Sequence, residues 1–241
     1  MTLVAAMEDV ISRDDRRIDS GSGSKTLNRA PQDNTTERRQ SPRAVLVGSQ
    51  PEYRSTKSRE TGESGVLQPG ASVIFFSYWR SLAAYRVRVA LALKGLPHEV
   101  RPIDIARGEH RGEAYLSVNP QAVLPALQVA EGVVLTQSLA IIEYLDETFP
   151  DPPLLPRDPG ARARVRAIAL VHAADTHPLL VPRIRTRLSQ HRAIDDADWQ
   201  RWAHDTLIPG MQTIEALLAR SPETGAFCHG DAVTVADIGL A

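Results

Sequence analysis

A serine at the start of a predicted helix is the first residue in this sequence that could do chemistry. Ser81 follows the apolar run ASVIFF and four further residues, and it precedes a helix-like stretch that ends near Lys94 and Gly95. The free N–H groups and positive dipole end of a helix favour a negative charge just outside it. The Ser81 hydroxyl could donate to a bound thiolate and lower its pKa from about 8.5. It could also be only a helix cap, which is the simpler interpretation of the turn alone.

Three other features of the sequence could complete a site for a peptide-like thiol. Gln137 and Ser138 open the next long helix and offer an amide, a hydroxyl and helix N–H groups to a carboxylate. Leu124-Pro125 stands directly before a predicted strand, and Asn119-Pro120 places a turn ahead of it. A thiol with a terminal α-carboxylate would find its donors in this set.

The elements that position these residues alternate between strands and helices. The pattern predicts strands at 72–77 and 98–105, helices at 81–94, near 111–117 and at 138–149, and a hairpin made of ALQVA and VVLT around Glu131-Gly132. The order βαβαββα predicts one α/β layer of the thioredoxin type at 71–150. In that layout Ser81 and the three residues after it replace Cys-x-x-Cys, so redox chemistry is absent. Leu124-Pro125 falls where the layout has a cis-proline.

The second half of the chain reads as helical. Prolines between 150 and 159 predict a stiff linker, and residues 157–241 predict an all-helical domain with long helices at 160–175 and 196–220. Pro209 should kink or break the second of these. Thr234 and Asp237 have the spacing of a capping box, so a helix should begin there. The sequence stops at Ala241, and we therefore expect that helix to be unfinished.

Composition limits the class of protein. The chain has 28 basic and 29 acidic residues and 42% hydrophobic content, which predicts a soluble globular protein with no general attraction to nucleic acid. Residues 1–70 contain polar runs of mixed charge and few apolar residues, and we predict a disordered extension. The single cysteine, Cys228, excludes an internal disulfide and is expected to be an inert core residue. No transmembrane run or secretory signal is evident, so the cytoplasm is the expected location.

Several motifs together resemble one family. The segments are SYWRSLAAYRVRVALALKG, NPQAVLPAL, LTQSLAIIEYLDE, LLPRDP, DTHPLLVPRIRTRL and FCHGDAVTVADIGL. In this order and spacing they resemble the zeta-class glutathione transferases, known chiefly as maleylacetoacetate isomerases, over roughly residues 72–241. The resemblance implies a glutathione-binding thioredoxin-like domain, a helical domain and a homodimer.

The resemblance also implies roles for particular residues. Ser81 corresponds to the family's thiol-activating serine, with Leu82, Ala83 and the residues up to Arg86 around the sulfur. His110 would reach the glycine end of glutathione, Leu124 beside Pro125 would bond the cysteinyl part, and Gln137 with Ser138 would hold the γ-glutamyl part. Ser81 and Arg86 are the expected catalytic residues. For the substrate carboxylates, the candidates are Arg80, His177 and Arg183, each of which could instead have a structural role, His177 as a helix cap.

The implied reaction is the cis–trans isomerisation of maleylacetoacetate to fumarylacetoacetate in tyrosine and phenylalanine catabolism. Thiolate addition, bond rotation and elimination would regenerate glutathione. No metal-ligand spacing appears, because His172 and His177 lie five residues apart without a matching Cys or carboxylate set.

The chain departs from the family pattern at two places. Leu82 and Ala83 stand where relatives often have Ser and Cys, and Leu179 and Leu180 with Val181 follow His177-Pro178 where bacterial relatives have two asparagines. The substrate is therefore less certain than the use of glutathione. Maleylpyruvate isomerase, a general glutathione transferase, an α-halo-acid dehalogenase and a catalytically silent binding module of the same fold remain alternatives. The retained Ser81 and Gln137-Ser138 argue against the last.

Overall fold

The four-stranded sheet has the connectivity that the sequence predicts. The computed structural model describes residues 73–240, and the extension predicted at 1–70 lies outside that range. The strands are β1 (Val73–Ser77), β2 (His98–Pro102), β3 (Ala126–Ala130) and β4 (Val133–Thr136), in the spatial order β2-β1-β3-β4. β1 pairs parallel with β2 and antiparallel with β3, and β3 forms a hairpin with β4. The predicted order βαβαββα is confirmed.

The second strand is shorter than predicted. It ends at Pro102 instead of residue 105, with one further backbone bond from Ile103 N to Ser77 O at 2.9 Å. The carboxylate of Asp104 then accepts a hydrogen bond from Ala106 N at 2.8 Å, which closes a turn in place of strand pairing. The strand therefore ends where the Asp104 side chain bonds the backbone two residues further along the chain.

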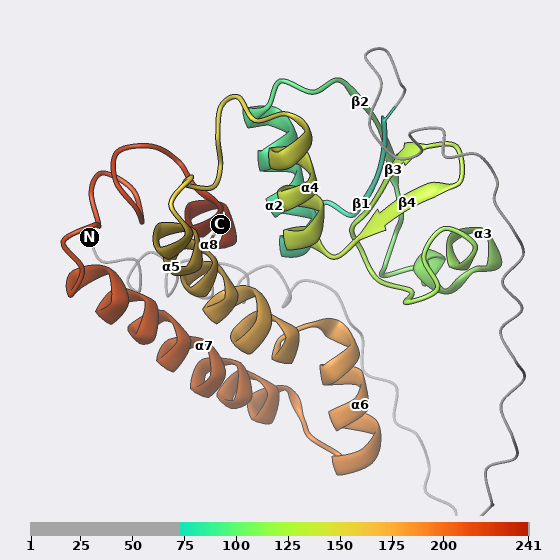
Figure 1. The fold of residues 1–241 in the computed structure, drawn as a ribbon. Coiled ribbons are helices and arrows are strands. Elements are labelled where there is room, and N and C mark those ends of the chain that lie inside the picture. Colours follow the sequence, from blue (N-terminus) through green and yellow to red (C-terminus); the bar gives the residue numbers. More distant parts are fainter. Residues whose placement is uncertain (1–72, 241) are drawn as a thin grey trace, which may run out of the picture. The chain divides into compact units, whose positions relative to one another are not determined.

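Helices cover both faces of the sheet. α2 (Leu82–Leu93) and α4 (Ser138–Thr148) lie side by side on one face, and α3 (Glu113–Leu116), preceded by the 3₁₀ helix η1 (Glu109–Arg111), lies on the other (Figure 1). Strand alternation explains this, because Phe75 and Phe76 point to opposite faces. Phe75 is fully buried, whereas Phe76 packs edge-on against Tyr115 of α3 with ring centroids 5.9 Å apart.

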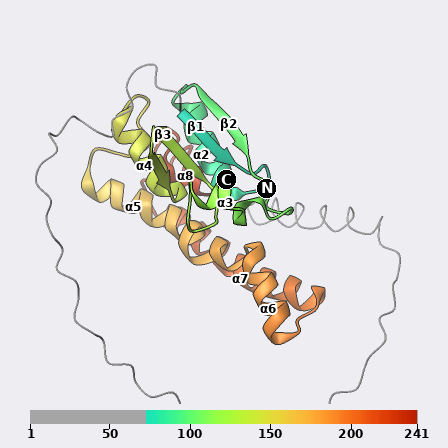
Figure 2. The ribbon, with the colours of Figure 1, turned by 90° about the vertical axis from the view of Figure 1, so that its right-hand side faces the viewer.

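The described chain after residue 158 contains helices and loops but no named strand. The elements are α5 (Pro159–Leu170), the π-helix η2 (Val171–Thr176), the 3₁₀ helix η3 (His177–Leu179), α6 (Pro182–Arg192), α7 (Asp196–Ala219) and α8 (Val235–Leu240). α5 and α7 run alongside each other, and α6 connects their far ends (Figure 2). α8 packs on α5 so closely that a Cβ at Gly239 would lie 2.9 Å from Ala169 Cα. This contact brings α8 against α2 as well.

Pro209 does not break α7, which stays helical from Asp196 to Ala219. The proline denies the helix one hydrogen bond, but Leu207, Met211 and Ile214 on the same helix are buried. Burial of this apolar face outweighs the lost bond. The next residue, Gly210, lets α7 approach the π-helix, because a Cβ there would lie 2.4 Å from Thr176 Oγ1.

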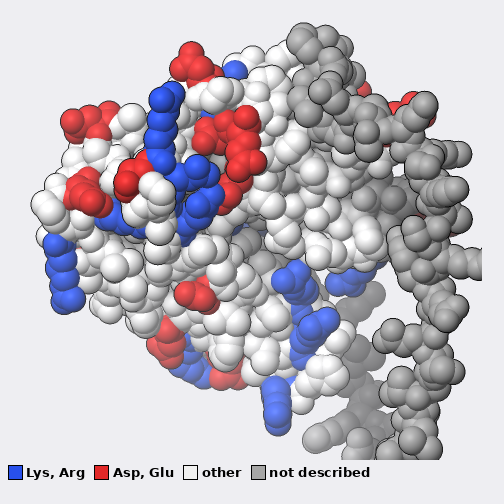
Figure 3. All heavy atoms as spheres, in the orientation of Figure 1, with Lys and Arg blue, Asp and Glu red and all other residues white. Residues whose placement is uncertain are grey.

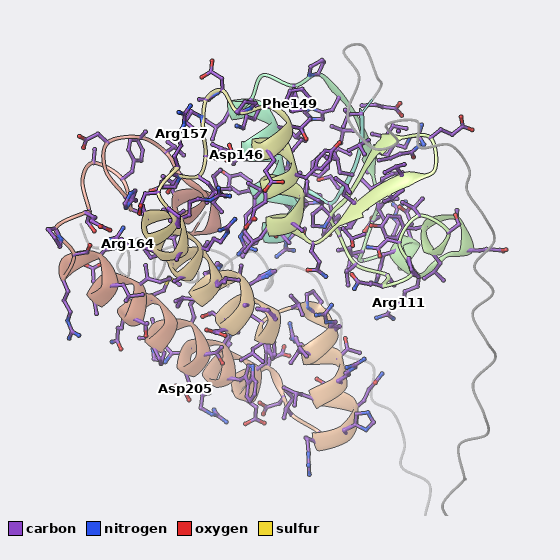
Figure 4. The ribbon with its side chains drawn as sticks, viewed as in Figure 1. Arg111, Asp146, Phe149, Arg157, Arg164 and Asp205 are labelled. Carbon is purple, nitrogen blue, oxygen red and sulfur yellow. The ribbon has the colours of Figure 1, made fainter. Side chains whose placement is uncertain are left out.

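A buried lysine ties the proline-rich linker to the sheet layer. The Lys94 side chain is fully buried at the end of α2 and donates to Asp146 Oδ1 at 2.7 Å and to the carbonyls of Phe149 and Pro152 at 2.6 Å each. Asp146 also accepts from the backbone N–H groups of Leu154 and Leu155. Figure 4 shows Asp146 and Phe149 at the end of α4, from which the linker leaves.

The predicted helix start at residue 234 is confirmed, with one difference in its hydrogen bonds. Asp237 Oδ2 accepts from Thr234 N at 2.7 Å and from the Thr234 hydroxyl at 2.8 Å, so that the hydroxyl donates where a capping box would have it accept. The other oxygen of Asp237 accepts from Cys228 N at 2.8 Å. Cys228 is 7% exposed, and burial raises the pKa of its thiol to about 12. The thiol is therefore protonated at neutral pH.

Candidate active site

Ser81 caps α2 and still has a hydroxyl proton to donate. Its backbone is extended, and its Oγ accepts a hydrogen bond from Ala84 N at 3.2 Å. Ser81 N bonds Tyr78 O at 3.0 Å, which fixes the turn that leaves β1. An accepted bond at Oγ leaves the O–H free to donate outward at the positive end of the helix. The two interpretations of Ser81, cap and thiol activator, are therefore compatible.

The loop before β3 is held by polar side chains. The Leu124-Pro125 bond is cis, at the position where the sequence predicts it. Tyr115 Oη and Asn119 Nδ2 both donate to Val123 O, at 2.7 and 2.8 Å. These two bonds fix the backbone next to Leu124, whose side chain is buried. Its backbone is thus held in place for a ligand at the start of β3.

Gln137 occupies an unusual backbone conformation at the entry to α4. Its φ is +68° and its ψ is +116°, and its Nε2 lies 3.0 Å from Gln121 Oε1 as a donor. A non-glycine residue at positive φ costs on the order of 1–3 kcal/mol and is concentrated at functional sites. The strain presents the Gln137 backbone and the start of α4, where Ser138 is nearly buried. Gln121 was not identified from the sequence.

Arg86, His172 and His177 come together from three elements. The Arg86 side chain is 1% exposed; its Nε donates to Gly239 O at 3.1 Å, and its Nη2 has no partner within residues 73–240. His172 is 2% exposed and its Nδ1 has no partner either. The rings of His172 and His177 have centroids 6.0 Å apart. The result is a buried basic cluster, which sequence reasoning did not predict.

The π-helix is what brings the two histidines together. In an α-helix, residues five apart are rotated by roughly 140° around the axis, whereas the i→i+5 register of a π-helix places them on adjacent turns. Thr176 Oγ1 donates to Val171 O, five residues back, at 3.0 Å. Pro178 has no N–H to continue an α-helical ladder. A histidine five residues before His-Pro was thus a usable signal, which α-helical periodicity hides.

Both imidazoles are held neutral. Burial lowers the pKa of His172 to about 4, with the nearby Arg86 guanidinium as a second cause. Burial also lowers the pKa of His177 to about 4, helped by Arg86, His172 and Arg183. Burial lowers the pKa of Arg86 itself to about 10, which leaves it charged at neutral pH. Arg86 is therefore the fixed charge of the cluster.

The remaining predicted residues are not part of this cluster, although the charge of Arg183 helps to lower the pKa of His177. His110 is buried on η1 with no partner for Nδ1, and burial lowers its pKa. The Arg80 guanidinium lies over the ring of Trp79, 5.5 Å from its centroid. Arg183 is exposed on α6, whose part of the face in Figure 3 shows mainly basic side chains. Leu82 is 42% exposed beside Ser81, with Ala83 next to it.

Within residues 73–240, no group of His, Cys, Asp or Glu side chains is arranged to hold a metal ion. In the same range, no helix has the length and apolar character needed to cross a membrane.

Comparisons with known proteins agree on one family. Residues 80–148 match the glutathione S-transferase N-terminal domain. The chain is 42% identical over 167 residues to a maleylacetoacetate isomerase of Pseudomonas aeruginosa, covering 68% of this chain and 76% of that protein. It is 40% identical over 162 residues to a maleylpyruvate isomerase of a Ralstonia species, covering 67% and 76%.

A solved structure has the same fold. The maleylacetoacetate isomerase of Methylobacterium extorquens AM1, determined with bound malonate and glutathione, superposes with a TM-score of 0.67 at 44% identity, covering 69% of this chain and 78% of that one. This chain belongs to the zeta-class glutathione transferases, the family of the maleylacetoacetate isomerases.

Proposed function

We propose that this protein is a glutathione-dependent isomerase that converts maleylacetoacetate to fumarylacetoacetate. The observation that carries the proposal is the Ser81 hydroxyl, which accepts from Ala84 N and keeps its own proton for a ligand at the start of α2. Relatives about 40% identical that are named maleylacetoacetate isomerase support the reaction. Thiolate stabilisation by one hydrogen bond and a helix terminus is a recognised way of activating sulfur.

The residues present fit glutathione. Ser138 lies at the first turn of α4, where free N–H groups favour a carboxylate, and the strained Gln137 precedes it. Leu124 would offer its backbone beside cis-Pro125, and His110, with an unpartnered ring nitrogen, would take the glycine end. Small or flexible side chains at Leu82 and Ala83 leave access to Ser81. When bound, glutathione supplies the thiol on which the isomerisation depends.

A dicarboxylate substrate requires positive potential near the sulfur. Arg86 is charged and buried on the second turn of α2, and it has no carboxylate partner in the described structure. The charge of Arg183, on α6, helps to lower the pKa of His177, and Arg80 directly precedes Ser81. We assign Arg86 to stabilising the charge that develops during the reaction, and Arg80, His177 and Arg183 to the substrate carboxylates.

Maleylpyruvate is the second candidate substrate. It is favoured by the Ralstonia maleylpyruvate isomerase, which is nearly as similar to this chain as the maleylacetoacetate isomerases are. Both reactions isomerise a cis double bond conjugated to a carbonyl group. The residues assigned here to glutathione and to the substrate carboxylates could bind either substrate.

The proposal extends to the domains, the oligomeric state and the location of the protein. A thioredoxin-like domain at 71–150 is supported by the family match, which ends at residue 148, and a helical domain follows at 157–241. We also propose that the protein forms a homodimer and acts in the cytoplasm, both on the basis of its family.

The test follows absorbance of each substrate with the full chain and glutathione. We expect maleylacetoacetate to isomerise faster than maleylpyruvate, and neither to react without glutathione. Faster turnover of maleylpyruvate would reverse the order of the two candidates. No turnover of either by protein that binds glutathione would contradict the proposed function.

A further inference from the structure

The basic cluster of Arg86, His172 and His177 contains two buried polar atoms without partners. These atoms are Arg86 Nη2 and His172 Nδ1. Buried polar groups in proteins are almost always hydrogen-bonded, and exceptions at a site call for an explanation. The cluster comes from α2, η2 and η3, and the π-helix specifically brings the two rings to 6.0 Å. The π-helix places His172, which has an unsatisfied ring nitrogen, beside His177, and this local widening of the helix suggests a function for the two histidines.

The charged groups on the surrounding elements do not neutralise the cluster. The charge of Arg86 lowers the pKa of both imidazoles, and His172 and Arg183 lower that of His177 further. The nearby carboxylates are engaged or exposed: Asp237 of α8 accepts from Thr234 and Cys228, Asp205 of α7 lies beside His204, and Asp175 of η2 is exposed.

Three basic side chains of the neighbouring helices have partners elsewhere. Arg88 of α2 donates to Ser77, Arg164 of α5 to Cys228 O, and Arg166 of α5 to Glu143. Arg162 of α5 has a buried Nε without a partner. No described anion therefore balances the charge of Arg86.

A neutral imidazole suits an anionic ligand poorly. It has one N–H donor and one lone pair, whereas the imidazolium has two donors and a positive charge. An opposite charge within about 4–6 Å favours the charged form and raises the pKa. A carboxylate at His177, which is partly exposed, would therefore favour its protonation. His172 lies behind it with an unpartnered ring nitrogen.

We propose that binding of a dicarboxylate is coupled to the uptake of one proton by the His172–His177 pair. The proton comes from solvent and is held by His177, while the ligand carboxylates stay ionised and no covalent bond changes. The inference rests on the proposed function, because it places a dicarboxylate at His177. It adds that the site acquires its second positive charge only when the ligand is present.

Proton uptake has a measurable consequence. If one proton enters with each ligand, affinity rises by up to about tenfold for each pH unit that the pH falls, since binding and protonation are linked. Fumarate is added to protein already loaded with glutathione, so the proposed contacts of glutathione at Leu124, Gln137, Ser138 and His110 are made beforehand and do not contribute to the change.

The experiment is calorimetry of fumarate binding to the glutathione-loaded full chain at pH 6. Both carboxyl groups of fumarate are ionised at this pH, so the ligand brings no protons. Titrations in phosphate and in Bis-Tris, which differ in ionisation enthalpy, give the number of protons taken up. We expect about one proton per fumarate, no uptake in His177→Gln, and unchanged uptake in His191→Gln, a control at an exposed histidine of α6.

The possible outcomes separate the two proposals. Equal heats of binding in both buffers would overturn the inference and leave the isomerase proposal intact. Uptake that persists in His177→Gln would overturn the assignment to this pair. If fumarate does not bind, the inference is also overturned, and the isomerisation assay then decides the proposed function by itself. The comparison of the two buffers uses only the wild-type protein, so it tests the inference even if a variant folds poorly.

Discussion

Replacing Arg86 with methionine should separate folding from function. Arg86 is 1% exposed, and among the described residues its Nε donates to Gly239 O while its Nη2 has no partner. A buried charge without a counter-charge destabilises the folded state. Met is unbranched and of similar length, so it can follow the path of the arginine side chain.

The magnitude follows from the pKa of the guanidinium. A pKa lowered from 12.5 to about 10 corresponds to a destabilisation of the charged form by about 3 kcal/mol. Arg86→Met relieves this but loses one hydrogen bond, worth about 1–3 kcal/mol when a charged group donates. We expect the free energy of unfolding to be unchanged or to rise by up to about 2 kcal/mol.

Isomerisation should nevertheless slow in Arg86→Met. Arg86 lies five residues along α2 from Ser81, roughly 7.5 Å of helix rise. At about 8 Å and an effective dielectric constant of about 20, a unit charge is worth roughly 2 kcal/mol, or about 30-fold in rate.

Denaturant unfolding and kcat would be measured together. The control is Arg88→Met on the same helix, where Arg88 Nη2 donates to Ser77 Oγ at 3.1 Å. It should lose about 1 kcal/mol of stability and retain its rate. If Arg86→Met instead lost more than about 3 kcal/mol while keeping its kcat, the arginine would be structural and the reasoning would be refuted.

Three further results are expected. Ser138→Ala should weaken glutathione binding by about 1–3 kcal/mol in calorimetry, and an unchanged affinity would remove Ser138 from the site. Lys94→Met should lower the free energy of unfolding by about 3–5 kcal/mol, because it leaves the Asp146 carboxylate without its counter-charge. Arg101→Met, at an exposed ion pair, should lower it by less than about 1 kcal/mol. Similar losses in the two variants would contradict this prediction. The pKa values of His172 and His177 are lowered to about 4 in the folded protein, so on acidification the unfolded chain binds protons at higher pH than the folded protein does. The free energy of unfolding should therefore be highest above about pH 6.5 and fall steadily toward pH 4. A flat profile would contradict the burial argument.

The sheet layer was predictable because its signals are local. Alternating apolar residues, the turn at Glu131-Gly132 and the capping serine each act over a few residues, and the element order they predicted is confirmed. Element ends were less predictable, since the end of β2 depends on the side chain of Asp104. The continuity of α7 through Pro209 depends on tertiary burial, which outweighs a local propensity.

The candidate site was predictable only in part. The capping role of Ser81 and the cis bond at Leu124-Pro125 follow from position in a known layout, and both are present. The meeting of Arg86 with His172 and His177 is different, because it needs the π-helix and the approach of α7 at Gly210. These are long-range packing effects, which helical periodicity does not predict.

The most direct test of the account is the pH dependence of isomerisation by Ser81→Ala. The variant should raise the thiol pKa of bound glutathione and slow isomerisation at pH 7 by roughly 10- to 1000-fold, the usual effect of losing one activating hydrogen bond. Higher pH should partly restore the rate, because the thiolate then forms unaided. Ser81→Thr, which keeps a hydroxyl, should retain most of the activity. A wild-type rate at pH 7, or an equal loss at every pH, would show that Ser81 is only a helix cap.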